Sequence, residues 1–521
     1  MQDIMTSMLL IAVPENRLPR FMPYWTSLTF CFSLIFCTFG LGQAAADSSG
    51  TIAIEAALRA HDFEQALQLA HNQLRKSPNN AKVWTFEGIA LSKLGRDKEA
   101  LNAYDRALRI SPKYLAALEG AAELDYKAGS ARARPLLERI LKIRPEEPTT
   151  HAMLGVLAYK EHDCTAATKH FRASKALISS QPVALAEYGS CLMELQQTQD
   201  ALPVFQQILT LRPDDLHARY NLAVVQLAVG HASDAISTVQ PLLQITQEDP
   251  DVLDLASSAY EETGDTPQAV NLLRRAIVLD PTKVWYYIDF ATLSFTHQSF
   301  QVGIDMINAG LKQIPSAAPL YVARGILYIQ LGQYEKGETD FADAIRLDPR
   351  ETSGAVAEGL AQIQQSNLDQ ALTTVRSELK KHPEDSFLHY LQAQTLFQKG
   401  ADPDTVEFKQ ALAEAERAVQ LKPDFVLVRD LLGNLYLKSG QVEKAIEQSR
   451  RALQENPSDQ EAVYHLIQAL RKSGDNRQEL PALVKRLAEL RQESRKAEAS
   501  GTKYKLYELE PQNANAAQQS R

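Results

Sequence analysis

Twelve prolines recur along this chain at nearly constant intervals. Six of the eleven intervals are 33 or 34 residues, and the other five lie between 31 and 40. The prolines are Pro78, Pro112, Pro145, Pro182, Pro213, Pro250, Pro281, Pro315, Pro349, Pro383, Pro423 and Pro457. A period in this range is typical of a stacked repeat array, in which each unit contacts mainly its neighbours. The sequence therefore predicts one long array and not a set of globular domains.

Between successive prolines the pattern predicts two helices. In the unit ending at Pro112, Trp84, Gly88 and Leu91 are spaced 4 and 3 apart, which places them on one helical face. The break Gly95-Arg96-Asp97 follows. A second helical stripe then runs through Ala100, Tyr104, Ala107 and Leu108. Pro112 ends this helix, because proline has no N–H to donate and disfavours helix in the residue before it.

Small residues recur twelve positions apart, one on each helix of a pair. The pairs are Gly88/Ala100, Gly155/Ala167, Gly189/Ala201, Gly325/Gly337, Gly359/Ala371 and Gly433/Ala445. Aromatic residues follow the second small residue by four, at Tyr104, Phe171, Phe205 and Phe341. Two helices approach closely only where neither carries a bulky side chain, so the spacing predicts tight crossings, each filled by one ring.

This pattern resembles the tetratricopeptide repeat (TPR) family over about 450 of the 521 residues. The best-matching units carry Trp84, Gly88, Ala100, Tyr104, Ala107 and Pro112, and Tyr321, Gly325, Tyr328, Phe341, Ala344 and Pro349. The resemblance implies an all-α fold, a right-handed α-solenoid of about 11–12 stacked helix pairs with a concave groove. Two departures are expected: about six extra residues near Ala401–Asp404, and a kink at Pro241 within a second helix.

The array is predicted to span residues 47–499. Before it, residues 25–42 form an apolar run that follows Arg17 and Arg20 and precedes Ala44–Ala46. This order is typical of an export signal cut after Ala46, and the exported chain would be periplasmic or secreted and of bacterial type. The alternative is an uncleaved membrane anchor, because about 18 residues just suffice to span a bilayer.

The tail, residues 500–521, is polar and predicted to be disordered. Within it Tyr504, Leu506 and Leu509 alternate loosely with charged residues, so a docking strip is the alternative.

The sequence contains no known catalytic or cofactor-binding motif: no HExxH, GxSxG, P-loop or GxGxxG after a strand. We therefore expect no enzyme activity and no cofactor. His162, Cys164 and His170 are close in sequence, but their spacing matches no common zinc motif, so no metal is expected. The net charge of −9, with no basic cluster, argues against nucleic acid as a partner.

Cys164 and Cys191 are the two cysteines that follow the apolar run. The first opens a second helix, and the other lies near the end of the following first helix. Both are expected at the same edge of the stack, so a disulfide is feasible in an exported protein. The alternative is that each is a small buried residue that fills a gap.

The resemblance also implies that the first helix of each pair lines the groove. Candidate groove residues are Trp285, Ile288, Thr292, Phe295, Val322, Ile326, Ile329, Val356, Leu360, Ile363, Glu187, Asp254 and Glu261. The groove would then be acidic in its earlier units and apolar in its later ones. An apolar strip suits an extended peptide or a helix, although apolar residues at helical spacing also form ordinary packing between helices.

These observations favour a non-catalytic scaffold in the cell envelope that binds proteins or peptides along the groove. The alternative is a glycan-binding component of an exopolysaccharide or cell-wall machine, with Trp285, Tyr286 and Tyr287 stacking on sugar rings. A membrane contact is expected only through an uncleaved N-terminal anchor.

Overall fold

The structure is a computed structural model that describes residues 48–245, 248–474, 478–500 and 505–506. Within these ranges the regular structure is helical throughout. The predicted export signal, most of the predicted tail, and Tyr504 and Leu509 lie outside the described residues. Of the helices described, none combines the length and apolar character that a membrane span needs.

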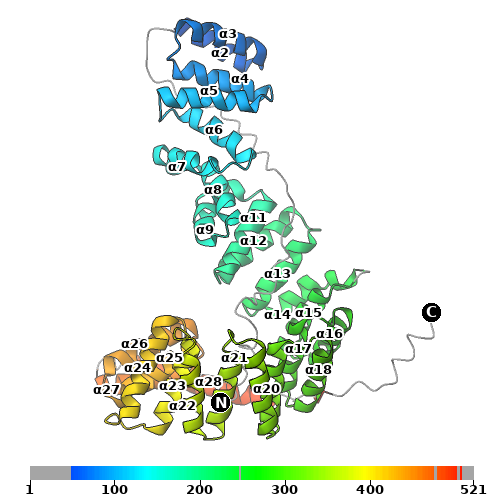
Figure 1. Cartoon of the computed structure of the whole chain (residues 1–521), viewed down its shortest axis with the longest axis vertical. Helices are drawn as coiled ribbons and strands as arrows, with labels where there is room; N and C mark the ends of the chain where they lie inside the picture. The colour runs from blue at the N-terminus through cyan, green and yellow to red at the C-terminus, as the bar shows by residue number, and fades with distance from the viewer. Residues whose placement is uncertain (1–47, 246–247, 475–477, 501–504, 507–521) are drawn as a thin grey trace, which may run out of the picture. The chain divides into compact units, whose positions relative to one another are not determined.

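The chain divides into two compact units, on either side of residues 246–247 (Figure 1). The first unit contains α2 (Ser48–Arg59), α3 (Phe63–Lys76), α4 (Ala81–Lys93), α5 (Asp97–Ile110), α6 (Leu115–Lys127), α7 (Ala133–Ile143), α8 (Pro148–Lys160), α9 (Cys164–Ala173), α10 (Lys175–Ile178), α11 (Pro182–Glu194), α12 (Thr198–Leu211), α13 (Leu216–Ala228), α14 (Ala232–Val239) and the 3₁₀ helix η1 (Leu242–Gln244).

The second unit contains the remaining helices, coloured green to red in Figure 1. They are α15 (Pro250–Glu262), α16 (Thr266–Leu279), α17 (Val284–Thr296), α18 (Phe300–Gln313), α19 (Ala318–Gln330), α20 (Tyr334–Leu347), α21 (Ser353–Gln364), α22 (Leu368–Leu379), α23 (Ser386–Lys399), α24 (Val406–Leu421), α25 (Val426–Lys438), α26 (Val442–Glu455), α27 (Gln460–Ser473) and α28 (Leu480–Ser500).

In nearly every pair, the turn between the two helices contains one residue in the left-handed conformation. Glycine occupies it in most pairs, as at Gly95 (φ 75°) and Gly332 (φ 72°), because glycine has no Cβ to clash there. The other occupants are His61, His162, Gln196, Gln298 and Ser366. Aspartates then begin several second helices. Asp62 and Asp265 each accept a hydrogen bond from the backbone N–H three residues later, as N-caps do. The repeat in sequence thus produces the same turn geometry in one helix pair after another.

The glycines of the small-residue pattern are sites where a ring lies directly against a backbone. A Cβ added at Gly88 would lie 2.6 Å from Cε1 of Tyr104, and one added at Gly325 would lie 2.5 Å from Cε1 of Phe341. Both rings belong to the second helix of the same pair and are buried. The predicted close crossings filled by one aromatic ring are therefore present at these pairs.

Ion pairs on the surface link neighbouring pairs at a recurring separation. Arg132 pairs with Asp105 at 2.7 Å, 27 residues earlier, and Arg172 pairs with Asp200 at 2.9 Å, 28 residues later. Arg450 reaches Glu479 at 3.1 Å over 29 residues. These groups are partly exposed, so each pair contributes only about 0–1 kcal/mol. The stability of the stack comes mainly from its buried apolar side chains.

Two local features differ from a uniform repeat. Six residues, Gly400–Thr405, connect α23 and α24, whereas three connect most helix pairs, and α24 is itself longer than the second helices that precede it. The turn thus holds part of the predicted insertion, and the rest lengthens the helices on either side. At Pro241 the structure corrects the expected kink: α14 ends at Val239, and Pro241 precedes the short helix η1. The proline lacks the N–H that would continue the helix, so the helix stops instead of bending.

Candidate functional site

The first helix of the second unit, α15, presents a polar stripe that is only partly covered. Asp251, Asp254, Ser258 and Glu261 are half-buried, and Glu262 is exposed. Spacings of 3 and 4 place the first four residues on one face of the helix. We call these five residues the α15 stripe. It contains two of the candidate groove residues, Asp254 and Glu261.

Hydrogen bonds to the next helices hold the acids of the α15 stripe. Oε1 of Glu261 lies 2.8 Å from Nε2 of His297, and the same ring nitrogen lies 3.1 Å from the hydroxyl of Thr266. Tyr286 donates its phenol hydrogen to Oδ1 of Asp251 at 2.5 Å. The other carboxyl oxygen of Glu261, Oε2, is buried and has no hydrogen-bond partner among the described residues. Glu261 therefore keeps one enclosed acceptor without a donor in the described structure.

The apolar candidate residues lie in a different environment. The structure buries Ile288, Phe295, Val322, Ile326, Ile329, Val356 and Leu360. Trp285, Thr292 and Ile363 are half-buried. The expectation that these residues form an open apolar groove therefore needs correction for the seven buried ones. For Ile329 the cause is visible: its Cδ1 would lie 2.7 Å from a Cβ at Gly337, so the isoleucine fills the space that this glycine leaves on α20.

The three aromatic residues considered for glycan stacking are also mostly enclosed. Tyr286 and Tyr287 are buried. The hydroxyl of Tyr287 donates to the carbonyl of Pro281 at 3.0 Å. Trp285 is half-buried, and the ammonium of Lys283 lies 4.7 Å from its ring centre. Only one of the three rings is thus placed at the surface, and a cation already covers part of it.

In the first unit, acidic groups with raised pKa values lie on the first helices. Burial raises the pKa of the Glu187 carboxyl to about 7, against the opposing charge of Lys160. Its Oε2 is buried and has no hydrogen-bond partner among the described residues. The charge of Glu187 also helps burial to raise the pKa values of Tyr126 and Tyr159, so these two phenols lie near the carboxyl. Glu187 is therefore partly protonated at neutral pH, in an environment that favours a cationic partner.

Glu119, on α6, has a similar environment. Burial raises its pKa to about 7, although Arg144 lies 3.7 Å from its Oε1. In the second unit, burial and the neighbouring Asp459 raise the pKa of Asp430 to about 9. Asp430 is on α25, and Asp459 is the N-cap of α27. At neutral pH Asp430 is therefore protonated, and its carboxyl group contributes no negative charge.

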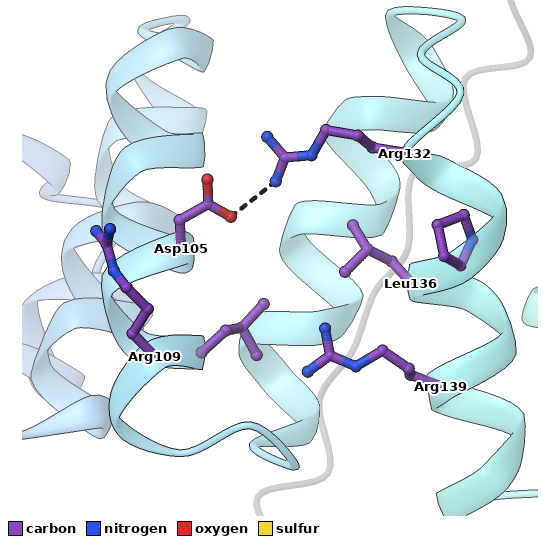
Figure 2. Close-up of a pocket in the computed structure, with 7 residues that line it drawn as sticks. Asp105, Arg109, Arg132, Leu136 and Arg139 are labelled. Atoms are coloured by element: carbon purple, nitrogen blue, oxygen red, sulfur yellow. Dashed lines mark hydrogen bonds and ion pairs between the residues drawn. The ribbon is translucent and has the colours of Figure 1, made fainter.

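A pocket of about 410 Å³ lies between the second helices α5 and α7 (Figure 2). Its lining residues are Asp105, Leu108, Arg109, Arg132, Pro135, Leu136 and Arg139. Figure 2 shows Arg132 extending across the pocket to Asp105. Arg139 donates to the carbonyl of Pro112, whereas Arg109 has no ion pair within the described part of the chain. No sequence motif predicts this pocket, because its residues come from two helix pairs.

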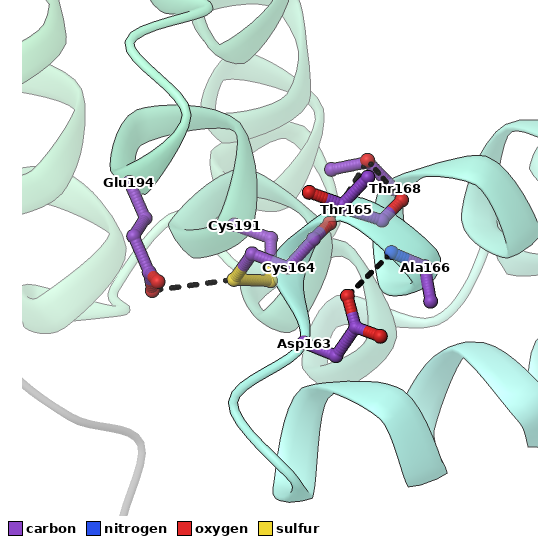
Figure 3. The surroundings of a disulfide bond; sticks show 7 residues. All are labelled: Asp163, Cys164, Thr165, Ala166, Thr168, Cys191 and Glu194. Atoms are coloured by element: carbon purple, nitrogen blue, oxygen red, sulfur yellow. Dashed lines mark hydrogen bonds between the residues drawn. A yellow bond between two sulfur atoms is a disulfide. The ribbon is translucent and has the colours of Figure 1, made fainter. Parts of the chain in front are cut away.

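Cys164 and Cys191 form a disulfide (Figure 3). Cys164 is the first residue of α9, and Cys191 lies on α11, so the bond ties one helix pair to the next. Both cysteines are buried. Oε2 of Glu194 lies 3.2 Å from Sγ of Cys164, although the sulfur of a disulfide has no proton to donate.

The grouping of His162, Cys164 and His170 does not form a ligand set. Cys164 is in the disulfide, and His170 faces His151, with 2.9 Å between their Nδ1 atoms. Burial and the neighbouring His151 lower the pKa of His170. No cluster of three or more potential metal ligands occurs among the described residues.

Sequence profiles described as tetratricopeptide repeat match residues 57–121, 192–259, 318–351, 356–424 and 407–470. Together these segments cover more than half of the chain. The chain belongs to the tetratricopeptide repeat family. Its helix pairs, left-handed turns and glycine–ring contacts are the structural form of that repeat.

Individual relatives are distant. The chain is 22% identical over 295 residues to Superkiller protein 3 of Schizosaccharomyces pombe, which covers 53% of this chain and 20% of that protein. It is 22% identical over 245 residues to Hsp70-Hsp90 organizing protein 1 of Glycine max, which covers 45% of this chain and 41% of that protein. The chain thus spans only a fifth to two fifths of these relatives. The crystal structure of yeast Tom70 is similar with a TM-score of 0.35 and 16% identity, over 90% of this chain and 98% of that one.

Proposed function

We propose that this TPR protein is a non-catalytic scaffold that binds proteins or peptides through the α15 stripe of its second unit. The observation that carries the proposal is the partly covered, acidic α15 stripe, in which one carboxyl oxygen of Glu261 lacks a hydrogen-bond partner in the described structure. An extended segment with basic side chains would pair with the partly exposed carboxylates of the stripe. The printed name of one relative, Hsp70-Hsp90 organizing protein 1, also supports a scaffold that binds other proteins.

The negative charge of the α15 stripe indicates the kind of partner that it would bind. The chain is acidic overall, with a net charge of −9, and Asp251, Asp254 and Glu261 concentrate carboxylates on one helix. A stripe of this sign attracts lysine- or arginine-rich segments, and complementary charge mainly speeds association and excludes acidic partners. We therefore expect the binding to weaken as salt concentration rises.

The decisive experiment places a cation in the centre of the stripe. Ser258→Arg introduces a bulky positive group at a half-buried position, and Val278→Arg is the matched control because Val278 is 77% exposed on the second helix of the same pair. Each purified variant is used to capture proteins from a cell-envelope extract. We expect Ser258→Arg to lose the partners that wild type and Val278→Arg retain. An identical set of partners for all three proteins would contradict the proposed binding face.

We also propose that the chain is exported to the cell envelope. The apolar run 25–42 with its preceding arginines supports export, and so does a buried disulfide, because disulfides persist mainly in oxidising compartments. The test is the intact mass of the protein from its native host, with Asp47 expected as the first residue. A cytosolic protein that retains residues 1–46 and has free thiols would contradict export.

A further inference from the structure

Leu506, in the C-terminal segment, contacts a distant part of the second unit. The backbone N–H of Leu506 donates a hydrogen bond to Oγ of Ser299 at 3.2 Å, although the two residues are 207 positions apart. Leu506 is 2% exposed, so its side chain is enclosed. A leucine of this exposure is shielded from water to the same degree as a core residue.

At this turn, the hydroxyl oxygen of Ser299 can accept a hydrogen bond from a segment distant in sequence. It is the N-cap of α18, yet its side chain forms no capping bond to its own helix in the described structure. In the preceding pair the equivalent residue, Asp265, accepts from the N–H of Gln268. The Ser299 hydroxyl oxygen is thus available as an acceptor, and Leu506 uses it.

Apolar surface adjoins this acceptor. Phe300 follows Ser299 directly, and its ring meets that of Phe295 edge to face, with 5.9 Å between the centroids. Phe295 is buried and Phe300 is half-buried. The acceptor for Leu506 is therefore next in sequence to a residue of an aromatic pair. One polar anchor next to an apolar surface is the usual composition of a site for an extended peptide.

The segment reaches this turn from the far end of the unit. The first part of α28 packs on α27 through Leu487 and Leu490, and Gln460 of α27 donates to the carbonyl of Leu490 at 3.5 Å. From Leu490 to Leu506, ten helical residues and six further residues can span roughly 35 Å at most. The chain therefore links the last helix pair to the α17–α18 turn, although four complete pairs lie between these elements in sequence.

We propose that the α17–α18 turn is a docking site for an extended, leucine-bearing segment, and that the chain's own C-terminal segment at Leu506 is its intramolecular ligand. Tethering gives such a segment an effective concentration on the order of millimolar. A partner with the same chemistry must displace it, so the segment regulates access to this turn. The turn adjoins the α15 stripe, because His297 at its start is hydrogen-bonded to Glu261. The test of this docking site nevertheless depends on no external partner.

The first experiment uses the segment itself as the probe. A fluorescent peptide with the sequence of residues 500–513 is titrated into the full chain and into a chain that ends at Ser500. We expect the shortened chain to bind the peptide at least 10-fold more tightly than the full chain does, because its site is vacant. A peptide with Leu506→Asp should bind the shortened chain at least 10-fold more weakly. Equal affinity of the two chains, or of the two peptides, would overturn the proposal.

A second measurement uses the full chain, in case shortening perturbs the fold. Hydrogen exchange of the Leu506 amide should be slow in wild type and at least several-fold faster in Ser299→Ala, which lacks the acceptor. The matched control is Asn367→Ala, at the same position of the pair two repeats later, where the N-cap side chain also forms no capping bond in the described structure. Fast exchange in wild type, or the same rate in Ser299→Ala as in wild type, would show that the segment does not dock.

Discussion

Tyr286 donates its phenol hydrogen to the Oδ1 atom of Asp251, 35 residues earlier, at 2.5 Å. Tyr286 is buried on α17, and Asp251 lies on α15. Burial and this hydrogen bond raise the pKa of the tyrosine, so the phenol keeps its proton. The bond thus links the first helices of two successive pairs and fixes one end of the α15 stripe.

Tyr286→Phe should destabilise the protein by about 1–2 kcal/mol, because the half-buried carboxylate of Asp251 loses its donor while the ring stays packed. The measurement is urea denaturation followed by circular dichroism. Tyr321→Phe is the control, because Tyr321 donates to a carbonyl within its own turn region, Pro315, at 3.1 Å. A loss no larger than that of the control would show that the link between the pairs contributes little.

Gly325→Ala should destabilise the array by about 1–3 kcal/mol, because its Cβ would lie 2.5 Å from the ring of Phe341 and the buried ring has little room to move. The double variant with Phe341→Leu should recover part of this loss, since the smaller side chain leaves space for the methyl group. Thermal denaturation of the two single variants and the double variant measures the coupling. If the losses of stability in the two single variants simply add in the double variant, Gly325 and the ring of Phe341 are not in contact.

The repeat, the helix pairs and the close crossings could be predicted from the sequence, because each depends on local residue types. Proline and glycine act on their own turn, and Gly325 and Phe341 lie in one unit. The exposure of the candidate groove could not be predicted, because a shift of one position decides whether a side chain points outward or into a neighbour. Ile329 illustrates this, since its burial depends on the space left by Gly337.

The remaining features depend on residues far apart in sequence. The arginine pocket combines α5 and α7, and the docking of Leu506 combines residues 207 positions apart. The repeat pattern of the sequence does not predict contacts between residues so far apart. The end of α14 at Val239 is a different case: proline predicts a disturbed helix, but the surrounding packing decides between a kink and a stop.

Loss of the disulfide should lower the stability of the first unit. Replacing both Cys164 and Cys191 with serine removes a cross-link that closes a loop of 27 residues, and about 2–4 kcal/mol of stability should be lost. Denaturation of wild type and the double variant, each with and without reductant, gives the measurement. We expect the reductant to destabilise wild type and to leave the variant unchanged. Two free thiols in the wild-type protein, found by mass spectrometry under non-reducing conditions, would show that Cys164 and Cys191 do not form the disulfide.

The pH dependence of stability should contain a contribution from Asp430. Its pKa in the folded chain is raised from 3.8 to about 9 by burial and by Asp459, so between these pH values the folded state holds a proton that the unfolded state has lost. The folded state binds more protons, and stability therefore falls as pH rises from about 4 to about 9. Asp430→Asn mimics the protonated carboxyl and removes this contribution.

At pH 9 we therefore expect Asp430→Asn to unfold at a higher temperature than wild type, with a gain of at least about 1 kcal/mol, whereas at pH 4 the two proteins should be nearly equal. Asp424→Asn, at an exposed aspartate near the start of the same helix, is the control and should show no such pH-dependent gain. Thermal unfolding at several pH values across this window measures the difference. A gain that is the same at pH 4 and pH 9 would mean that Asp430 ionises normally in the folded chain.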